Sequence, residues 1–302
     1  MAKVAGILVA MDMIDSAVVA VAGLGTRLYP TSAAVPKEML PLGRYPVLHH
    51  VLEELTAAGI RRILLVTNSR KPAIKKYVDG LPALAQTWKR IDFEFVEQGI
   101  PTSTAKPAGT GDAVALAERF VGDRHFVVAF GDSIVDGDCR GSLVRRMIRQ
   151  HEARQAACCI AVTEVPQEDV SRYGVVEPKQ GAGDDGTGAI PIDGIVEKPT
   201  PENAPSNLAV SARYSFSPAI FRELKETKST PDGEVYLTHA IAGLINSGLP
   251  VFAVPLNGQE RRCDIGNHAS YFEAFVDFAL ADPDCGDCLA SYMQNALVHR
   301  TA

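Results

Sequence analysis

Runs of apolar residues alternate with helical patterns along the first half of the chain. Continuous apolar runs predict buried strands at 17–22, 63–67, 93–97 and 126–130. Between them, apolar residues recur at the spacing of a helix face over 47–58 and 113–120. Because the strands are apolar throughout rather than alternating, helices should cover both faces of their sheet. The pattern therefore predicts βαβ units, in which ligands bind at the loops that follow the strands.

The second half of the chain is richer in predicted strands. Apolar runs predict strands at 156–163, 194–197, 208–216 and 251–255, and helical spacing predicts helices near 218–226 and 237–246. A further helix should begin near His268. The sequence contains no internal repeat, and no change in composition marks a linker between domains. We therefore expect one large α/β domain whose second half is rich in strands.

The composition limits the class of protein further. The 302 residues carry 36 acidic and 30 basic side chains, a net charge of −6, and 46% of them are hydrophobic. Such a chain can bury a large core without disulfides or a structural metal. The acidic balance argues against nucleic-acid binding, which would need a basic surplus. No apolar run reaches the ~18 residues of a membrane span, so we expect neither a nucleic-acid nor a membrane partner.

The N-terminal segment and the cysteines favour a cytoplasmic protein. Residues 1–16 precede the first strand, and Asp12 and Asp15 interrupt their short apolar run, so we expect no signal peptide. The six cysteines are scattered along the chain, which suits reduced thiols. Cys285 and Cys288 form a single CxxC motif without the second pair that a zinc site would need.

The most informative segment is GLGTR, at 23–27, directly after the first strand. Gly23 and Gly25 would let backbone N–H groups approach phosphate oxygens, and Arg27 and Lys37 would add cations nearby. A dinucleotide-binding fingerprint would need a third glycine where Leu28 stands, and the GK[ST] of a P-loop is absent. A tight turn with surface charges remains the alternative.

Two acids lie at positions suited to a metal ion. Asp132 follows the strand 126–130, and Asp264 precedes the predicted C-terminal helix. Two carboxylates and the substrate phosphates together can hold Mg²⁺, whereas one carboxylate cannot readily do so. Taken singly, each acid is more typical of a cap or a turn, and nearby Asp136 and Asp138 fit solvated turn acids.

The segment VEKP, at 196–199, combines a cation with a hydrogen-bond acceptor at the end of a predicted strand. Lys198 at a strand end can pair with a phosphate monoester, and the carboxylate of Glu197 can accept hydrogen bonds from hydroxyl groups. Upstream, Gly174 in YGVV allows close backbone approach to a ring-shaped ligand.

The order GLGTR, PKEMLPL, GD, YGVV, VEKP and DIGN resembles the sugar-1-phosphate nucleotidylyltransferases, in particular the bacterial UTP–glucose-1-phosphate uridylyltransferase family. The resemblance runs from residue 17 to about 279. It implies a doubly wound, mostly parallel Rossmann-like sheet, a Mg²⁺ cofactor and a homodimer or homotetramer. It also implies an N-terminal extension at 1–16, a nucleotidyltransferase domain at 17–280 and a C-terminal tail at 281–302. That domain would divide into a nucleotide-binding half at 17–155 and a sugar-phosphate-binding half at 156–280.

The resemblance also assigns roles to individual residues. Those lining the nucleotide would be Ala22, Gly23, Gly25, Thr26, Gln98 and Gly109. Gln98 would read the pyrimidine edge. Catalysis would rest on Arg27, Lys37, Asp132, Lys198 and Asp264, with Asp132 and Asp264 holding the metal. The sugar phosphate would contact Gly174, Glu197, Lys198, Asn207 and Arg213.

The implied reaction joins a nucleoside triphosphate to a sugar 1-phosphate, most simply UTP to glucose 1-phosphate, and releases pyrophosphate. The longer segment 99–108 and Asp112 depart from the family pattern beside the base site. They keep open an ATP- or GTP-dependent enzyme that acts on a modified sugar or cyclitol phosphate in a natural-product pathway. A non-catalytic, nucleotide-sensing relative is the more remote alternative.

Overall fold

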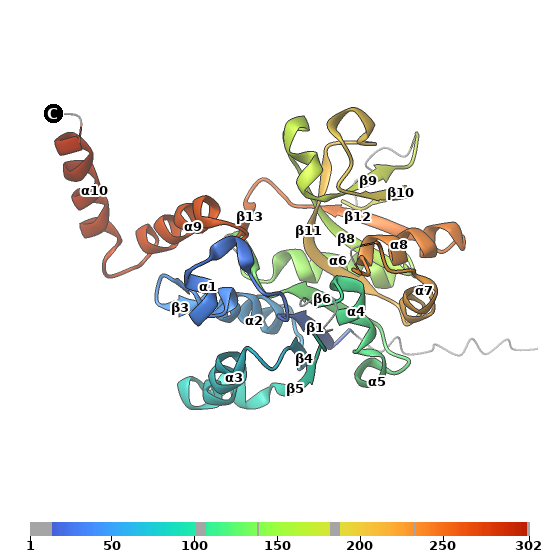
Figure 1. Ribbon diagram of the computed structural model, residues 1–302, viewed down its shortest axis with the longest axis horizontal. Coiled ribbons are helices and arrows are strands. Elements are labelled where there is room, and N and C mark those ends of the chain that lie inside the picture. The colour runs from blue at the N-terminus through green and yellow to red at the C-terminus, as the bar shows by residue number, and fades with distance from the viewer. Residues whose placement is uncertain (1–13, 101–106, 138, 182–187, 232, 301–302) are drawn as a thin grey trace, which may run out of the picture.

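One nine-stranded sheet runs through both halves of the chain, in the order β5-β4-β1-β6-β11-β8-β12-β10-β9. The computed structural model describes residues 14–100, 107–137, 139–181, 188–231 and 233–300 (Figure 1). The extension predicted at 1–16 therefore lies almost entirely outside the described residues. The strands of the sheet are β1 (Ser16–Ala20), β4 (Arg62–Thr67), β5 (Asp92–Glu97), β6 (Phe126–Phe130), β8 (Cys158–Glu164), β9 (Gly174–Pro178), β10 (Ile190–Glu197), β11 (Leu208–Phe216) and β12 (Val251–Pro255).

The first half of the sheet is parallel and the second half is mixed. The neighbours β5, β4, β1 and β6 all run parallel, as their continuous apolar runs predict. Strand β11 then joins β6 and β8 in antiparallel register, and β10 pairs antiparallel with β9 and β12. The α/β class is confirmed, but the sheet is less parallel than the resemblance implies. Antiparallel pairs make up most of the second half.

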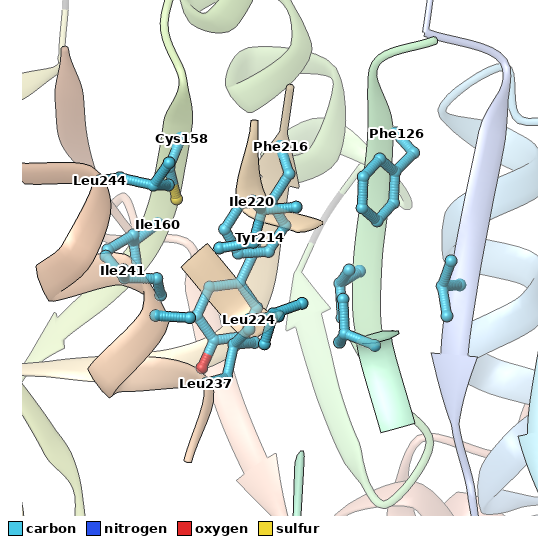
Figure 2. Packing of buried hydrophobic residues seen from close by; sticks show 14 of the residues in the cluster. Phe126, Cys158, Ile160, Tyr214, Phe216, Ile220, Leu224, Leu237, Ile241 and Leu244 are labelled. Atoms are coloured by element: carbon cyan, nitrogen blue, oxygen red, sulfur yellow. The ribbon is translucent and has the colours of Figure 1, made fainter. Parts of the chain in front are cut away.

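Helices cover both faces of the sheet, as expected. Side chains of β1 alternate between the faces, so Val18 joins one apolar cluster and Val19 the other. The first face is covered by α4 (Thr110–Ala115), α5 (Glu118–Val121), α7 (Ile220–Glu226) and α8 (Leu237–Asn246). Figure 2 shows part of this packing, in which Tyr214 and Phe216 of β11 lie against helical residues such as Leu237. The other face is covered by α2 (Val47–Ala57) and α3 (Pro72–Leu84), and α6 (Ser142–Ala153) packs on β8 and β12.

Small elements complete the chain around the ends of the central strands. Two-stranded sheets form from β2 (Pro41–Leu42) with β3 (Tyr45–Pro46), and from β7 (Ser133–Gly137) with β13 (Glu260–Asp264). The remaining α-helices are α1 (Thr31–Ala34), α9 (His268–Leu280) and α10 (Gly286–Arg300). The remaining short helices are 3-10 turns at Thr26–Leu28, Lys37–Met39, Gln86–Arg90, Gln167–Arg172 and Pro201–Asn203.

The predicted C-terminal tail contains a helix that projects from the body of the molecule. Figure 1 shows α10 extending beyond α9 and away from the sheet. Its side chains Tyr292, Leu297 and Val298 are all more than half exposed. None of the helices in the described part of the chain combines the length and the apolar character that crossing a bilayer requires.

Candidate active site

The glycine segment after β1 lines a cavity of about 340 Å³. All the residues predicted to bind the nucleotide lie in its wall, namely Ala22, Gly23, Gly25, Thr26, Gln98 and Gly109. Gly25 has a φ of 69°, a left-handed conformation in which a side chain is strained. A Cβ atom at Gly25 would also lie 3.3 Å from Cδ of Lys37. Glycine at this position therefore lets Lys37 pass close under the loop.

A buried ion pair holds this loop in place. Nζ of Lys71 donates to both carboxylate oxygens of Glu38, at 2.9 and 2.8 Å, and to the carbonyl of Val21 at 2.8 Å. Asn68 donates in the same way to the carbonyl of Ala22. These two hydrogen bonds fix the orientation of the peptide groups at Val21 and Ala22, at the start of the loop. Burial raises the pKa of Glu38 and lowers that of Lys71, although each attracts the other.

Lys37 reaches from this loop to the carboxylate of Asp132, with which it forms an ion pair. Both side chains are largely buried. Burial by itself would lower the pKa of Lys37, but the attraction of Asp132 prevails and the pKa is raised above its usual value. Burial would raise the pKa of Asp132, yet Lys37 holds that pKa below its usual value. The site therefore presents a cation and an ionised carboxylate side by side.

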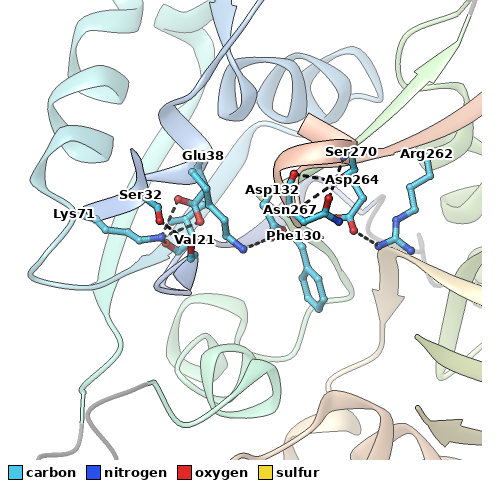
Figure 3. A network of polar contacts seen from close by, with 12 residues as sticks. Val21, Ser32, Glu38, Lys71, Phe130, Asp132, Arg262, Asp264, Asn267 and Ser270 are labelled. Atoms are coloured by element: carbon cyan, nitrogen blue, oxygen red, sulfur yellow. Dashed lines mark hydrogen bonds and ion pairs between the residues drawn. The ribbon is translucent and has the colours of Figure 1, made fainter. Parts of the chain in front are cut away.

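The two acids predicted to hold a metal are neighbours in the structure. Asp264 pairs with Ser133 across β13 and β7, and the N–H of Ile265 donates to the carbonyl of Asp132 at 3.1 Å. Figure 3 shows Asp132 and Asp264 in one polar network. Asp264 ends β13 and Asp132 directly precedes β7. Two neighbouring carboxylates of this kind suit a hard divalent cation whose remaining ligands come from phosphate and water.

The close approach of the segments that follow β1 and β6 depends on a glycine. A Cβ atom at Gly131, just before Asp132, would lie 2.4 Å from Cγ1 of Val21. Arg27 reaches the same area, because its Nη2 would lie 3.6 Å from a Cβ atom at Gly266, beside Asp264. The structure therefore brings Arg27, Lys37, Asp132 and Asp264 together, as the sequence predicts.

Gln98, at the carboxyl end of β5, forms the far side of the cavity. Its side chain is buried, and Nε2 donates to the carbonyl of Gly109 at 2.9 Å and to Oδ2 of Asp112 at 2.8 Å. Gly109 has a φ of 97°, and a Cβ atom there would lie 2.7 Å from the carbonyl oxygen of Val235. The residue predicted to read the base thus has a fixed orientation. Residues 101–106 of the lengthened segment lie outside the described residues.

A second cluster adjoins the cavity at the ends of β9 and β10. Glu197 pairs with Gly174 across these strands and accepts a hydrogen bond from Oγ1 of Thr238 at 2.9 Å. Nζ of Lys198 lies 3.3 Å from Glu197 and 4.9 Å from the ring centroid of Tyr236. Because Tyr236 also lines the cavity, it links the predicted sugar-phosphate residues to the nucleotide residues.

Two predicted sugar-phosphate residues are not in this cluster. Arg213 is completely buried, and its guanidinium donates to Glu54 at 2.7 Å and to the carbonyl of Ser133 at 2.8 Å. No part of it is accessible to a ligand, so the structure replaces the predicted contact with a core ion pair. Asn207 is exposed on the turn before β11 and is not in the wall of the cavity.

Sequence reasoning missed several residues that shape the site. Arg262 lies 3.6 Å from Asp264, and its guanidinium carbon lies 4.8 Å above the ring of Tyr173. Tyr236 and Lys71 were also missed. A lysine in the loop after β4 carries no motif, because its partner Glu38 is distant in sequence. The doubled arginine in ERRCDIGN was the one visible signal for Arg262.

Comparisons with known proteins identify the family of this chain. The nucleotidyl transferase family model matches residues 16–280. A UTP–glucose-1-phosphate uridylyltransferase of Bacillus subtilis is 34% identical over 297 residues, covering 95% of this chain and 98% of that protein. A Streptococcus pyogenes serotype M3 protein of the same name is 35% identical over 300 residues, covering 94% of this chain and 96% of that one.

The fold is also similar to a solved structure. That structure, a UTP-bound UGPase from Acinetobacter baumannii, superposes with a TM-score of 0.80 at 32% sequence identity. The match covers 93% of this chain and 99% of that one. The arrangement of the loop, the two acids and the second cluster is thus found in a chain that belongs to the nucleotidyl transferase family.

Proposed function

We propose that the protein transfers a uridylyl group from UTP to glucose 1-phosphate, giving UDP-glucose and pyrophosphate. The observation that carries this proposal is the single cavity in which a glycine loop, Lys37, Asp132 and Gln98 meet, with Lys198 beside it. Relatives that are 34–35% identical over nearly their whole length bear the name of this activity.

The reaction needs no general base. The attacking group is a phosphate oxygen of the sugar 1-phosphate, which is already an anion near neutral pH, and it displaces pyrophosphate from the α-phosphorus. The main barrier is therefore to bring two polyanions together in line. This accounts for a site whose described residues supply cations and carboxylates.

The cations divide between the two substrates. We assign Arg27 and Lys37, on the glycine loop, to the triphosphate and the departing pyrophosphate. Lys198 is assigned to the phosphate of the sugar, whose hydroxyl groups would donate to Glu197. Gly174 is also assigned to the sugar. A Cβ atom there would lie 2.9 Å from Cγ2 of Thr238 and 3.4 Å from Oε2 of Glu197, so glycine lets Glu197 and Thr238 keep their positions. Asn207 remains a weaker candidate for the sugar.

We propose Mg²⁺ as the divalent cation, held by Asp132 and Asp264. When bound, it offsets charge on the phosphate oxygens as the transition state forms. Lys37 is placed to share the Asp132 carboxylate with the ion, because it already contacts that carboxylate from the opposite loop.

The test is a panel of the four ribonucleoside triphosphates and dTTP against several sugar 1-phosphates, with pyrophosphate release as the readout. We expect UTP and glucose 1-phosphate to give the highest kcat/KM. A purine nucleotide that exceeds UTP by tenfold would overturn the proposed base, and a modified sugar or cyclitol phosphate that exceeds glucose 1-phosphate would overturn the proposed sugar.

We also propose that the chain forms a homo-oligomer through α10. The helix projects from the body and exposes Tyr292, Leu297 and Val298 (Figure 1). Removal of residues 286–302 should lower the mass measured by light scattering to that of a monomer. An unchanged mass would place the interface elsewhere, and a monomeric full chain would refute the assembly.

A further inference from the structure

The hydrogen bonds of Gln98 determine which atom of its side chain faces the nucleotide. The amide nitrogen Nε2 has two hydrogens, and the structure uses both, one on the Gly109 carbonyl and one on the Asp112 carboxylate. The oxygens of a carbonyl and of a carboxylate accept hydrogen bonds and do not donate them. If the amide were turned over, Oε1 would face two other acceptor oxygens. These two partners therefore exclude the flipped orientation.

The remaining polar atom of Gln98 is an acceptor without a partner. Among the described residues, no donor bonds to Oε1. Nor is Oε1 one of the described side-chain atoms that are both unpaired and sealed from solvent. Because Gln98 lines the cavity, this oxygen opens onto the space for the ligand. The backbone cannot swing it away easily, since the N–H of Gln98 donates to the carbonyl of Thr67 at 2.7 Å.

We infer that Asp112 is a positioning residue that locks the Gln98 carboxamide with its oxygen toward the base, so that the site selects a base carrying a ring N–H. Uracil has such a donor at N3, whereas the N3 of cytosine is an acceptor and would meet Oε1 with repulsion. The inference rests on the proposed function and explains how the site would distinguish one base from another. Asp112, a departure from the family pattern, then supports pyrimidine selection and does not reshape the pocket for a purine.

The location of Asp112 suits this indirect role. It lies on the first turn of α4, half-buried, and is absent from the wall of the main cavity. It acts only through Gln98. Gly109 holds the other hydrogen of the amide through a backbone carbonyl, which side-chain substitution cannot remove. The hydrogen bond to Asp112 is therefore the one that a substitution can remove.

The experiment compares UTP with CTP, which differ only at the edge that Gln98 meets. The wild type should favour UTP in kcat/KM. Asp112→Leu leaves one amide hydrogen unpaired and lets the amide turn, so the ratio of UTP to CTP should fall by about tenfold or more. Asp112→Asn still offers an acceptor oxygen and should keep the ratio within about threefold of the wild type. Asp123→Ala, which removes an exposed carboxylate outside the cavity, is the control and should change nothing.

Calorimetric titration of UTP and of CTP, without sugar phosphate, gives a second readout that does not depend on chemistry. If Asp112→Leu does not fold, as judged by circular dichroism, Asp112→Ala replaces it. A ratio that stays at the wild-type value in the apolar variant would overturn the inference, as would an equal loss in Asp112→Asn.

Failure of the proposed function would look different. A wild type that rejects UTP would overturn that function. The effect of Asp112 on Gln98 would then be measured by the ratio of kcat/KM for GTP to that for ATP, because guanine carries a hydrogen on N1 and adenine does not. A fall of that ratio in Asp112→Leu would support the lock, and no change would overturn it.

Discussion

Lys37 forms an ion pair with Asp132, although 95 positions separate them in the sequence. The contact joins the loop after β1 to the end of β6, the neighbouring parallel strand. Each charge offsets the desolvation of the other, which is why the pKa of Lys37 is raised and that of Asp132 is lowered. A phosphate entering between these loops meets a charged site that is already assembled.

The first prediction concerns the metal. Asp264→Ala and Asp132→Ala should each reduce turnover by about 10²-fold or more, the size typical of losing one electrostatic stabiliser of a transition state. Asp136→Ala on the same small sheet, where Asp136 is exposed, is the control. Pyrophosphate release is measured with and without EDTA. Near-normal rates in Asp264→Ala, with an unchanged circular dichroism spectrum, would contradict the assignment.

The second prediction separates the two substrate sites. Lys198→Ala removes the cation beside Glu197, so KM for glucose 1-phosphate should rise about 10- to 100-fold, as expected for loss of a charged hydrogen bond. The affinity for UTP, measured by calorimetry, should change little. Lys37→Ala should instead lower the affinity for UTP and leave KM for glucose 1-phosphate nearly unchanged.

A matched control is Lys179→Ala, since this lysine is exposed and pairs only loosely with Asp193 at 3.7 Å. If Lys198→Ala weakened both substrates equally, the division of the cations would be wrong.

The third prediction concerns the buried ion pair of Arg213 and Glu54. Removing one partner leaves an uncompensated charge in the core, so Glu54→Ala should lower the free energy of unfolding by about 3–5 kcal/mol. Arg213 also donates to the carbonyl of Ser133, the residue after Asp132. Movement of Arg213 in this variant should therefore displace Asp132 as well. Urea denaturation measures the first effect.

The neighbouring Glu53→Ala provides the comparison. Glu53 is partly exposed, and its ion pair with Arg140 should contribute about 1 kcal/mol or less. A loss in Glu54→Ala no larger than in Glu53→Ala would show that the core tolerates an unpaired Arg213.

The fourth prediction is a dependence of stability on pH. Burial, with the charge of His125 adding to it, lowers the pKa of His151 to about 3. The unfolded chain binds a proton at His151 near pH 6.5, whereas the folded chain does not, so stability is full above that pH and falls as pH decreases toward 3. Between pH 7.5 and 5.0 the free energy of unfolding should fall by about 1–2 kcal/mol from this group.

His151→Gln should flatten that slope in urea denaturation, because glutamine does not titrate. His239→Gln, at an exposed position, should leave it unchanged. An identical slope in the wild type and His151→Gln would mean that other groups cause the loss.

Much of the fold follows from local pattern. The strands predicted at 126–130, 208–216 and 251–255 and the helix at 237–246 are confirmed at those bounds. The predicted helix at 113–120 is instead two short helices, α4 and α5. Helices α3 and α6 were not predicted. The buried residues Leu143, Val144 and Met147 at helical spacing were a readable signal for α6. Strands β7 and β13 carry no continuous apolar run, and among the described residues each pairs only with the other.

The sequence by itself determined where most strands of the large sheet end and which chemistry follows them, although β1 ends at Ala20, two residues before its predicted end. Asp132 after β6 and Lys198 after β10 are set by chain connectivity alone, because a residue one or two positions beyond a strand must lie at its edge. Only the tertiary structure decided which distant groups meet. The pairing of Arg213 with Glu54 and of Gln98 with Asp112 depends on the order of strands and the seating of helices. Hydrogen bonds and ion pairs act over a few ångströms in space, and such distances between remote segments exist only once the core has packed.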